Sequence, residues 1–282
     1  MAPFAGCLTD QRLRVDAMAN EDSIGDSSAK SSDRPNIRRI GTADLIDALV
    51  KGLADFNAMP THLVFLGLIY PIVTLIFARA YAGLDVLPLV FPLLAGYTLI
   101  GPLVATGMYE LSRRREQGLY TSRANAFEVF RSPSILATGV LGAVLMVIYF
   151  AWLLVAWAIY VLNFGDAAPD SVTEFAQQVV TTPAGWTLIV EGSGAGFLFA
   201  VAVLALSVVS FPLLLDRHVG VMVAIKTSIR AVVANPVTIA IWGVVVAVAL
   251  VLGSLPLFVG LAVVMPVLGH ATWHLYRKIV EF

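Results

Sequence analysis

The sequence predicts an all-α membrane protein with six transmembrane helices, and three observations support this fold class. Of the 282 residues, 59% are hydrophobic and only 13% are charged, whereas soluble domains usually carry about 25% charged residues. Six apolar runs have a length close to that needed to cross about 30 Å of hydrocarbon. Lysine and arginine are confined to alternate connections between these runs, as the positive-inside rule requires.

The N-terminal segment differs in composition from the rest of the chain. Residues 1–43 contain polar stretches such as "EDSIGDSSAKSSDRP" and no compact apolar core of a signal peptide. Low hydrophobicity with mixed charge favours disorder, so we expect a disordered cytoplasmic tail over 1–43 and a six-span domain over 44–282. The single cysteine, Cys7, excludes an internal disulfide and a cysteine-based metal site.

Each span follows from an apolar run. The third and fourth runs are long, which favours tilt or an end that projects beyond the bilayer. The last two form one apolar stretch interrupted only by "LGSLP", where we expect a tight hairpin. The six predicted spans are 61–80, 86–109, 135–162, 186–213, 236–255 and 256–276.

Basic residues set the orientation. Seventeen of the eighteen lysines and arginines fall on the side that holds both termini, and Arg79 alone falls on the other. The opposite 163–185 connection contains Asp166, Asp170 and Glu174 but no base. The positive-inside rule therefore predicts a multi-pass membrane protein with both termini in the cytoplasm.

Three stretches share one layout, which predicts three repeated helical hairpins. "LVKGLADFNAMPTHLVFLGL", "ANAFEVFRSPSILATGVLGA" and "SIRAVVANPVTIAIWGVVVA" each place an amphipathic segment, a proline and then a span in succession. The prolines suit a first helical turn, and Ser132 and Asn235 before two of them could cap it. We expect each amphipathic segment to form an interfacial helix. The layout could also arise by chance, because prolines are common near helix ends.

His270 and His274 are candidate metal or haem ligands, because side chains four residues apart share one helix face. No glutamate accompanies them, and only His62 and His218 could add a third imidazole. The alternative is an interfacial aromatic belt of His270, Trp273, His274 and Tyr276. We expect no metal or cofactor, with His270 and His274 kept as candidate functional positions.

Four further candidates lie where spans two and four end. Glu110 has Arg113 within helical reach, and Asp216 and Arg217 follow the fourth apolar run directly. Such residues can pair to fix helix register, or they can converge on an anionic ligand. Both interpretations remain open at this point.

Glu191 is a carboxylate inside the apolar run "GWTLIVEGSGAGF". Ionisable groups at membrane depth are costly and often functional, and Gly192 and Gly196 have the GxxxG spacing of closely packed helices. Alternatively, the helix begins only after these glycines and leaves Glu191 at the outer interface.

The stretches "AGYTLIGPLVATGMYELSRRREQG", "SFPLLLDRHVG" and "LGHATWHLYR" resemble a bacterial family of predicted integral membrane proteins catalogued as a domain of unknown function. The resemblance covers about Asp44 to Val280 and implies a polytopic fold without an assigned activity. Members are sometimes labelled as related to cytochrome c oxidase subunit I. That label requires several histidines deep within the spans, whereas all four histidines here lie near predicted span ends.

The function predicted from the sequence is non-enzymatic. No nucleophile–base arrangement is evident, so we expect a binding, accessory or assembly protein of a membrane complex, and the alternative is a channel or transporter for a small solute or ion. Expected partners are the lipid bilayer, anionic lipid attracted by "SRRRE" at the cytoplasmic face, and another membrane protein. Nothing in the sequence supports nucleic-acid binding.

Overall fold

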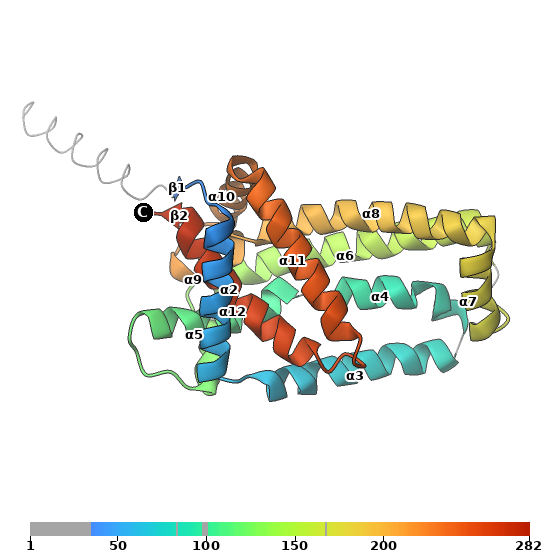
Figure 1. Cartoon of the computed structure of the whole chain (residues 1–282), viewed down its shortest axis with the longest axis horizontal. Coiled ribbons are helices and arrows are strands. Elements are labelled where there is room, and N and C mark those ends of the chain that lie inside the picture. The colour runs from blue at the N-terminus through green and yellow to red at the C-terminus, as the bar shows by residue number, and fades with distance from the viewer. Residues whose placement is uncertain (1–34, 83, 98–100, 167) are drawn as a thin grey trace, which may run out of the picture.

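The computed structural model describes residues 35–82, 84–97, 101–166 and 168–282. It is an all-α structure with a single two-stranded pairing in the described residues (Figure 1). The α-helices are α2 (Thr42–Ala58), α3 (His62–Ala82), α4 (Val90–Tyr97), α5 (Gly101–Glu116), α6 (Ile135–Phe164), α7 (Val172–Thr181), α8 (Pro183–Ser207), α9 (Ser210–Asp216), α10 (Val221–Ala234), α11 (Pro236–Ser254) and α12 (Leu261–Ile279). The remaining elements are the 3₁₀-helices η1 (Leu84–Leu89) and η3 (Arg123–Arg131) and the strands β1 (Asn36–Ile37) and β2 (Val280–Glu281).

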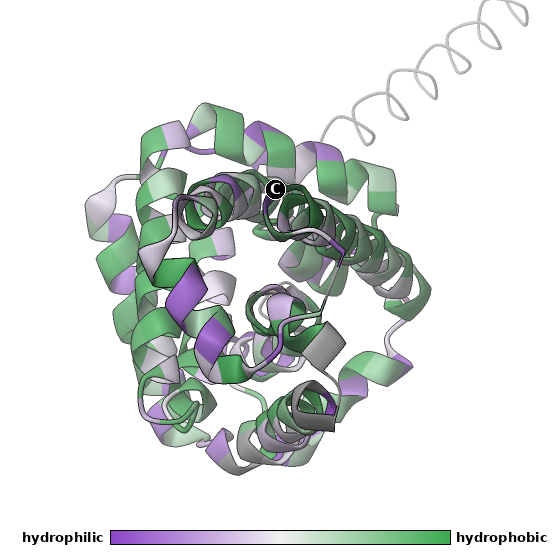
Figure 2. Ribbon diagram, turned by 90° about the vertical axis from the view of Figure 1, so that its right-hand side faces the viewer, coloured by the Kyte–Doolittle hydropathy of each residue, from purple (hydrophilic) through white to green (hydrophobic). Residues whose placement is uncertain are grey.

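Three helical stretches in the described residues are long and apolar enough to cross a membrane. They are α6 with 30 residues, Pro183–Asp216 (α8 and α9) with 34, and α11 with 19. At 1.5 Å per residue, α6 is about 45 Å long, which is more than the roughly 30 Å of hydrocarbon in a bilayer. Figure 2 shows that hydrophobic residues predominate along many of the helices, and large apolar side chains such as Leu154 and Val244 are exposed.

The polar side chains gather where α2, α5, α9 and the C-terminal half of α12 meet, which we call the polar end. There α2 crosses the other helices, while α7 crosses the opposite end (Figure 1). Gly52 permits the crossing, because a Cβ at Gly52 would lie 2.6 Å from the backbone N of Ala271. The small-residue contact brings the N-terminal and C-terminal helices together.

The expected hairpin between the last two apolar runs is present. Helix α11 ends at Ser254 and α12 begins at Leu261. The two glycines that flank the turn touch each other, since a Cβ on Gly260 would lie 2.7 Å from the carbonyl oxygen of Gly253. The absence of a side chain at both positions therefore allows the chain to reverse within six residues.

A helical segment precedes each of the three prolines that align the similar stretches. Helices α2 and α10 come before Pro60 and Pro236, and the segment before Pro133 is the 3₁₀-helix η3. Pro236 occupies the first turn of α11. Instead of capping that helix with its side chain, Asn235 accepts a hydrogen bond from Ile40 N and donates to Arg38 O. The expected cap is replaced by a bond that fixes the segment before α2.

Most of the predicted disordered tail, residues 1–34, lies outside the described residues. The part from Pro35 onward belongs to the fold, because Asn36 and Ile37 pair antiparallel with Glu281 and Val280. Helix α2 already begins at Thr42. The expected boundary at residue 43 is therefore too late, since pairing of β1 with β2 orders residues before it.

Candidate functional site

A buried carboxylate joins three helices at the polar end. Asp55 of α2 accepts hydrogen bonds from Ser112 Oγ (2.6 Å) and Arg115 Nη1 (2.8 Å) of α5, and it lies 2.8 Å from His274 Nε2 of α12. Ser112 Oγ is also 2.8 Å from His270 Nδ1. We call these five residues the Asp55 cluster.

The surroundings of Asp55 favour its charged form. Burial raises the pKa of this carboxyl, but hydrogen bonds from His274 and Ser112 lower it, and the net shift is downward. A buried carboxylate that receives several hydrogen bonds is stable as the anion. The cluster is thus an ionic link between helices that are distant in sequence.

The two candidate histidines have different environments. His274 bonds directly to Asp55, whereas His270 is fully buried and bonds through Nδ1 to Ser112. Within the described residues, the Nε2 atom of His270 has no hydrogen-bond partner. Nor do these residues contain a group of three or more His, Cys, Asp or Glu side chains placed to hold a metal ion. Both histidines therefore serve as hydrogen-bonded links, and the cofactor question stays a prediction.

The expected interfacial aromatic belt is wrong. Trp273 and Tyr276 are each only 1% exposed. Trp273 Nε1 donates to Glu116 Oε2 at 3.0 Å, and the Tyr276 hydroxyl donates to Asp216 Oδ2 at 2.7 Å. Packing of α12 beneath α2 and α5 covers the rings that the sequence pattern places at a membrane surface.

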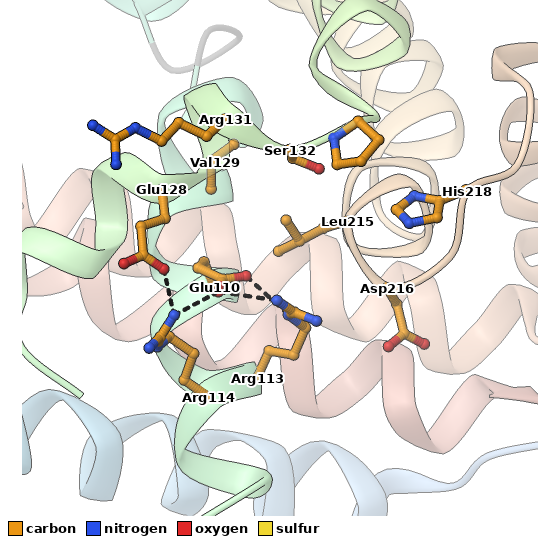
Figure 3. Close-up of a pocket in the computed structure, with 11 residues that line it drawn as sticks. Glu110, Arg113, Arg114, Glu128, Val129, Arg131, Ser132, Leu215, Asp216 and His218 are labelled. Atoms are coloured by element: carbon orange, nitrogen blue, oxygen red, sulfur yellow. Dashed lines mark hydrogen bonds and ion pairs between the residues drawn. The ribbon is translucent and has the colours of Figure 1, made fainter. Parts of the chain in front are cut away.

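A second feature of the polar end is a cavity of about 430 Å³ between α5, η3 and the C-terminal end of α9 (Figure 3). We call it the arginine pocket. Its ionisable lining residues are Glu110, Arg113, Arg114, Glu128, Arg131, Asp216 and His218.

Glu110 and the arginines after it form a paired network on one wall of this pocket. Arg113 donates Nε and Nη2 to the two carboxylate oxygens of Glu110, at 2.8 and 3.0 Å. Arg114 bonds Glu128 of η3 and lies 3.8 Å from Glu110. The pairing with Glu110 raises the pKa of Arg113. Glu110 and Arg113, expected from their spacing to pair, do so.

Asp216 and Arg217 diverge although they are adjacent. Asp216 lines the pocket and bonds Tyr276, with Arg277 Nη1 at 3.5 Å. Arg217 lies 3.9 Å from Asp216 and places its guanidinium 4.3 Å from the ring centroid of Phe282. Asp216 therefore shares the pocket with Glu110, while Arg217 stacks on the C-terminal residue.

Glu191 does not join either group. It is exposed on α8, and Asn163 Nδ2 donates to its Oε2 at 3.2 Å near the end of α6. The alternative in which the helix begins after the glycines is wrong, because α8 starts at Pro183. Gly196 packs 3.2 Å from Trp152, whereas Gly192 has nothing within 4 Å. Only one of the two glycines therefore makes a close helix contact.

Several residues of the site are absent from the sequence candidates, among them Asp55, Ser112, Glu116 and Glu128. One signal for Asp55 exists, since it follows Ala48 and Gly52 at helical spacing on the buried face of α2. A carboxylate on a face of small buried residues requires a partner. The sequence does not identify that partner, because Ser112 and His274 are 57 and 219 residues away.

Part of the chain is similar to a family of membrane proteins. Residues 90–216 match a family model described as a predicted integral membrane protein (DUF2189). The match runs from the start of α4 to the end of α9 and confirms the expected resemblance over that part. No curated protein and no solved structure matches. The family description supplies membrane integration and no activity.

Proposed function

From this likeness to a family of integral membrane proteins of unknown function, we propose a six-span protein of the bacterial inner membrane with both termini in the cytoplasm. The described helices follow the six apolar runs in order. Arg113, Arg131 and Arg277 lie at the polar end, whereas α7 at the opposite end carries Glu174 and no base. This charge asymmetry supports the orientation.

The proposed architecture consists of three units, each with an interfacial segment and a helical hairpin. The segments α2, η3 and α10 turn apolar side chains outward, for example Ile46, Phe130 and Ile229. The buried residues of α10 are small, namely Ala224, Thr227, Ser228 and Ala231. Its exposed large apolar residues are Met222, Val223, Ile229 and Val233. Basic Lys226 and Arg230 share this outward face. Such a mixed face suits a headgroup layer that contains anionic lipid.

The proposed activity is binding rather than catalysis: the protein acts as an accessory or assembly factor of a membrane complex. The observation that carries this proposal is the poor coverage of α11. Only 17% of the most apolar part of α11 is buried inside the protein, compared with 28% for α6 and 56% for the stretch that contains α8 and α9. Its exposed side chains include Val244, Val248 and Val251. Helices in a bilayer associate through close packing, and α11 offers an apolar face for a partner helix.

The test is purification in mild detergent with quantitative mass spectrometry. We expect a membrane protein to co-purify in a fixed ratio, and the double variant Val244→Trp/Val248→Trp to reduce its recovery by disturbing the packing surface. Leu154→Trp on the exposed face of α6 is the matched control and should leave recovery unchanged. A chain that always purifies alone, or equal recovery from both variants, contradicts the proposal.

A channel or transporter is the second candidate, and the exposed Asn163–Glu191 pair is the observation that favours it. This pair lies one residue from the end of the 30-residue α6, so it is distant from the midplane where transporters form their sites. Equal solute flux into proteoliposomes with the wild type and with Glu191→Gln would remove Glu191 from any pathway.

A further inference from the structure

The three carboxylates of the arginine pocket are already neutralised by their neighbours. Arg113 and Arg114 pair with Glu110, and Asn125 Nδ2 also donates to Glu128 at 2.7 Å. The hydroxyl of Tyr276 donates to Asp216, which has Arg277 nearby. A negatively charged ligand in the pocket would therefore meet carboxylates whose charge is largely compensated.

The cationic side of the pocket is not neutralised in the same way. Within the described residues Arg131 makes no hydrogen bond or ion pair. His218 contacts Ser134 through Nδ1 at 3.2 Å, which leaves its Nε2 for another partner. Ser132 accepts a hydrogen bond from Ser134 N and keeps its own hydroxyl proton available. Figure 3 shows that Arg131 and His218 lie on either side of Ser132.

Arg114 adds a second, independent indication of a ligand. Its Nε–H is buried and has no acceptor in the part of the chain that the structure describes, although its other nitrogens bond Glu128 and Tyr120 O. Leaving a buried donor without an acceptor is energetically unfavourable. An anionic oxygen in the pocket that Arg114 lines is suited to lower this cost.

The pocket lies at the depth expected for a lipid headgroup. It adjoins the first turn of α6 and the last turn of α9, which end two of the candidate spans. Phe127 and Phe130 of η3 are 59% and 70% exposed beside Arg131. Aromatic rings next to a cation are typical of the membrane interface.

We propose that the arginine pocket binds a phosphoryl group, carried by an anionic phospholipid or by a soluble phosphate, through Arg131, His218 and Ser132. Guanidinium groups hydrogen-bond phosphate oxygens strongly, and the positive N-terminal end of α6 adds to the attraction. The inference rests on the proposed function only in placing the polar end at the cytoplasmic leaflet. It requires no membrane-protein partner.

The test uses the delipidated full-length protein in a neutral detergent. Binding of short-chain phosphatidylglycerol, short-chain phosphatidylcholine and inorganic phosphate is measured separately by native mass spectrometry and by the shift in melting temperature. We expect phosphatidylglycerol to bind and Arg131→Gln/His218→Gln to weaken it about tenfold, the effect of losing roughly one charge-assisted hydrogen bond. Arg131→Lys, which keeps the charge, should retain more affinity than Arg131→Gln.

Arg123→Gln is the matched control, because Arg123 is exposed on the same η3 helix and does not line the pocket. Unchanged phosphatidylglycerol affinity in the double variant, or an equal loss in the control, overturns the proposal. Binding of inorganic phosphate without phosphatidylglycerol supports the phosphoryl site and assigns it to a soluble anion. Equal binding of phosphatidylcholine overturns the requirement for an anion. These binding measurements do not require a partner protein. If no protein co-purifies, the proposed accessory function fails while the phosphoryl site can still be confirmed or refuted.

Discussion

At the scale of single residues, Asp55 links three helices through its carboxylate. One carboxylate receives hydrogen bonds from a serine, an arginine and a histidine on two other helices. Because it is buried, its partners could not regain full hydration if the charge were removed. The charge of this one side chain therefore helps to hold α2 against α5 and α12.

We predict that Asp55→Asn lowers stability by about 2 kcal/mol at neutral pH, the usual effect of lost hydrogen bonds to a charged group. The folded-state pKa of Asp55 lies below the ordinary value of 3.8. Its stabilising contribution is therefore complete above that value and is lost as the pH falls through the folded-state pKa. Melting temperatures measured in detergent from pH 7 to pH 3 should show the wild type and the variant converging on the acid side.

The matched control for this prediction is Asp166→Asn, since Asp166 is exposed in the connection between α6 and α7. Its melting curve should follow the wild type at each pH. A constant difference between Asp55→Asn and the wild type down to pH 3 would contradict the linkage argument, because it would show a loss independent of protonation.

At the scale of elements, the contact between α2 and α12 is set by Gly52. We predict that Gly52→Ala destabilises the protein by about 1–3 kcal/mol, the usual cost of overpacking. The added methyl group would meet the backbone N and Cβ of Ala271 at 2.6 and 2.7 Å, so the helices must separate. The melting temperature in detergent measures this loss.

Gly139→Ala on α6 is the control, because nothing lies within 4 Å of a Cβ at Gly139. The alanine there should leave the melting temperature unchanged or raise it slightly, given its higher helix propensity. If Gly52→Ala behaves in the same way, then the close helix crossing does not exist as described.

The elements differ in how far the sequence predicts them, and the reason is the range of the interactions. The apolar runs that correspond to α6, to α8 with α9, and to α11 are local patterns, and their predicted bounds agree with the structure to within three residues. The Glu110–Arg113 pair is also local, three residues apart on one helix. The Asp55 cluster and the burial of Trp273 depend on α2 crossing α12. These helices are far apart in the sequence, so no local sequence pattern predicts their contact. Strand pairing between Asn36 and Glu281 likewise joins residues that are far apart in the sequence.

At the scale of the whole molecule, the proposed six-span topology has the polar end and α7 on opposite sides of the membrane. We predict that a cysteine at position 170, before α7, reacts with a membrane-impermeant maleimide in intact cells. A cysteine at position 117, after α5, should react only after permeabilisation. Both positions are exposed, so access to the reagent reflects topology rather than burial. The variants are Asp170→Cys and Gln117→Cys in a Cys7→Ser background, which removes the one native thiol.

The physical reason is the cost of moving clustered cations across the bilayer, since Arg113, Arg114 and Arg115 would have to leave the cytoplasmic side if the orientation were reversed. Denatured samples of both variants should label equally, which controls for reactivity. Labelling of position 117 in intact cells, with position 170 protected, would reverse the orientation. Labelling of both positions from one side would mean that the stretch containing α6 does not cross. The proposed six-span arrangement would then be wrong. The proposals that α2, η3 and α10 lie in the headgroup layer and that the arginine pocket lies at headgroup depth would be wrong with it.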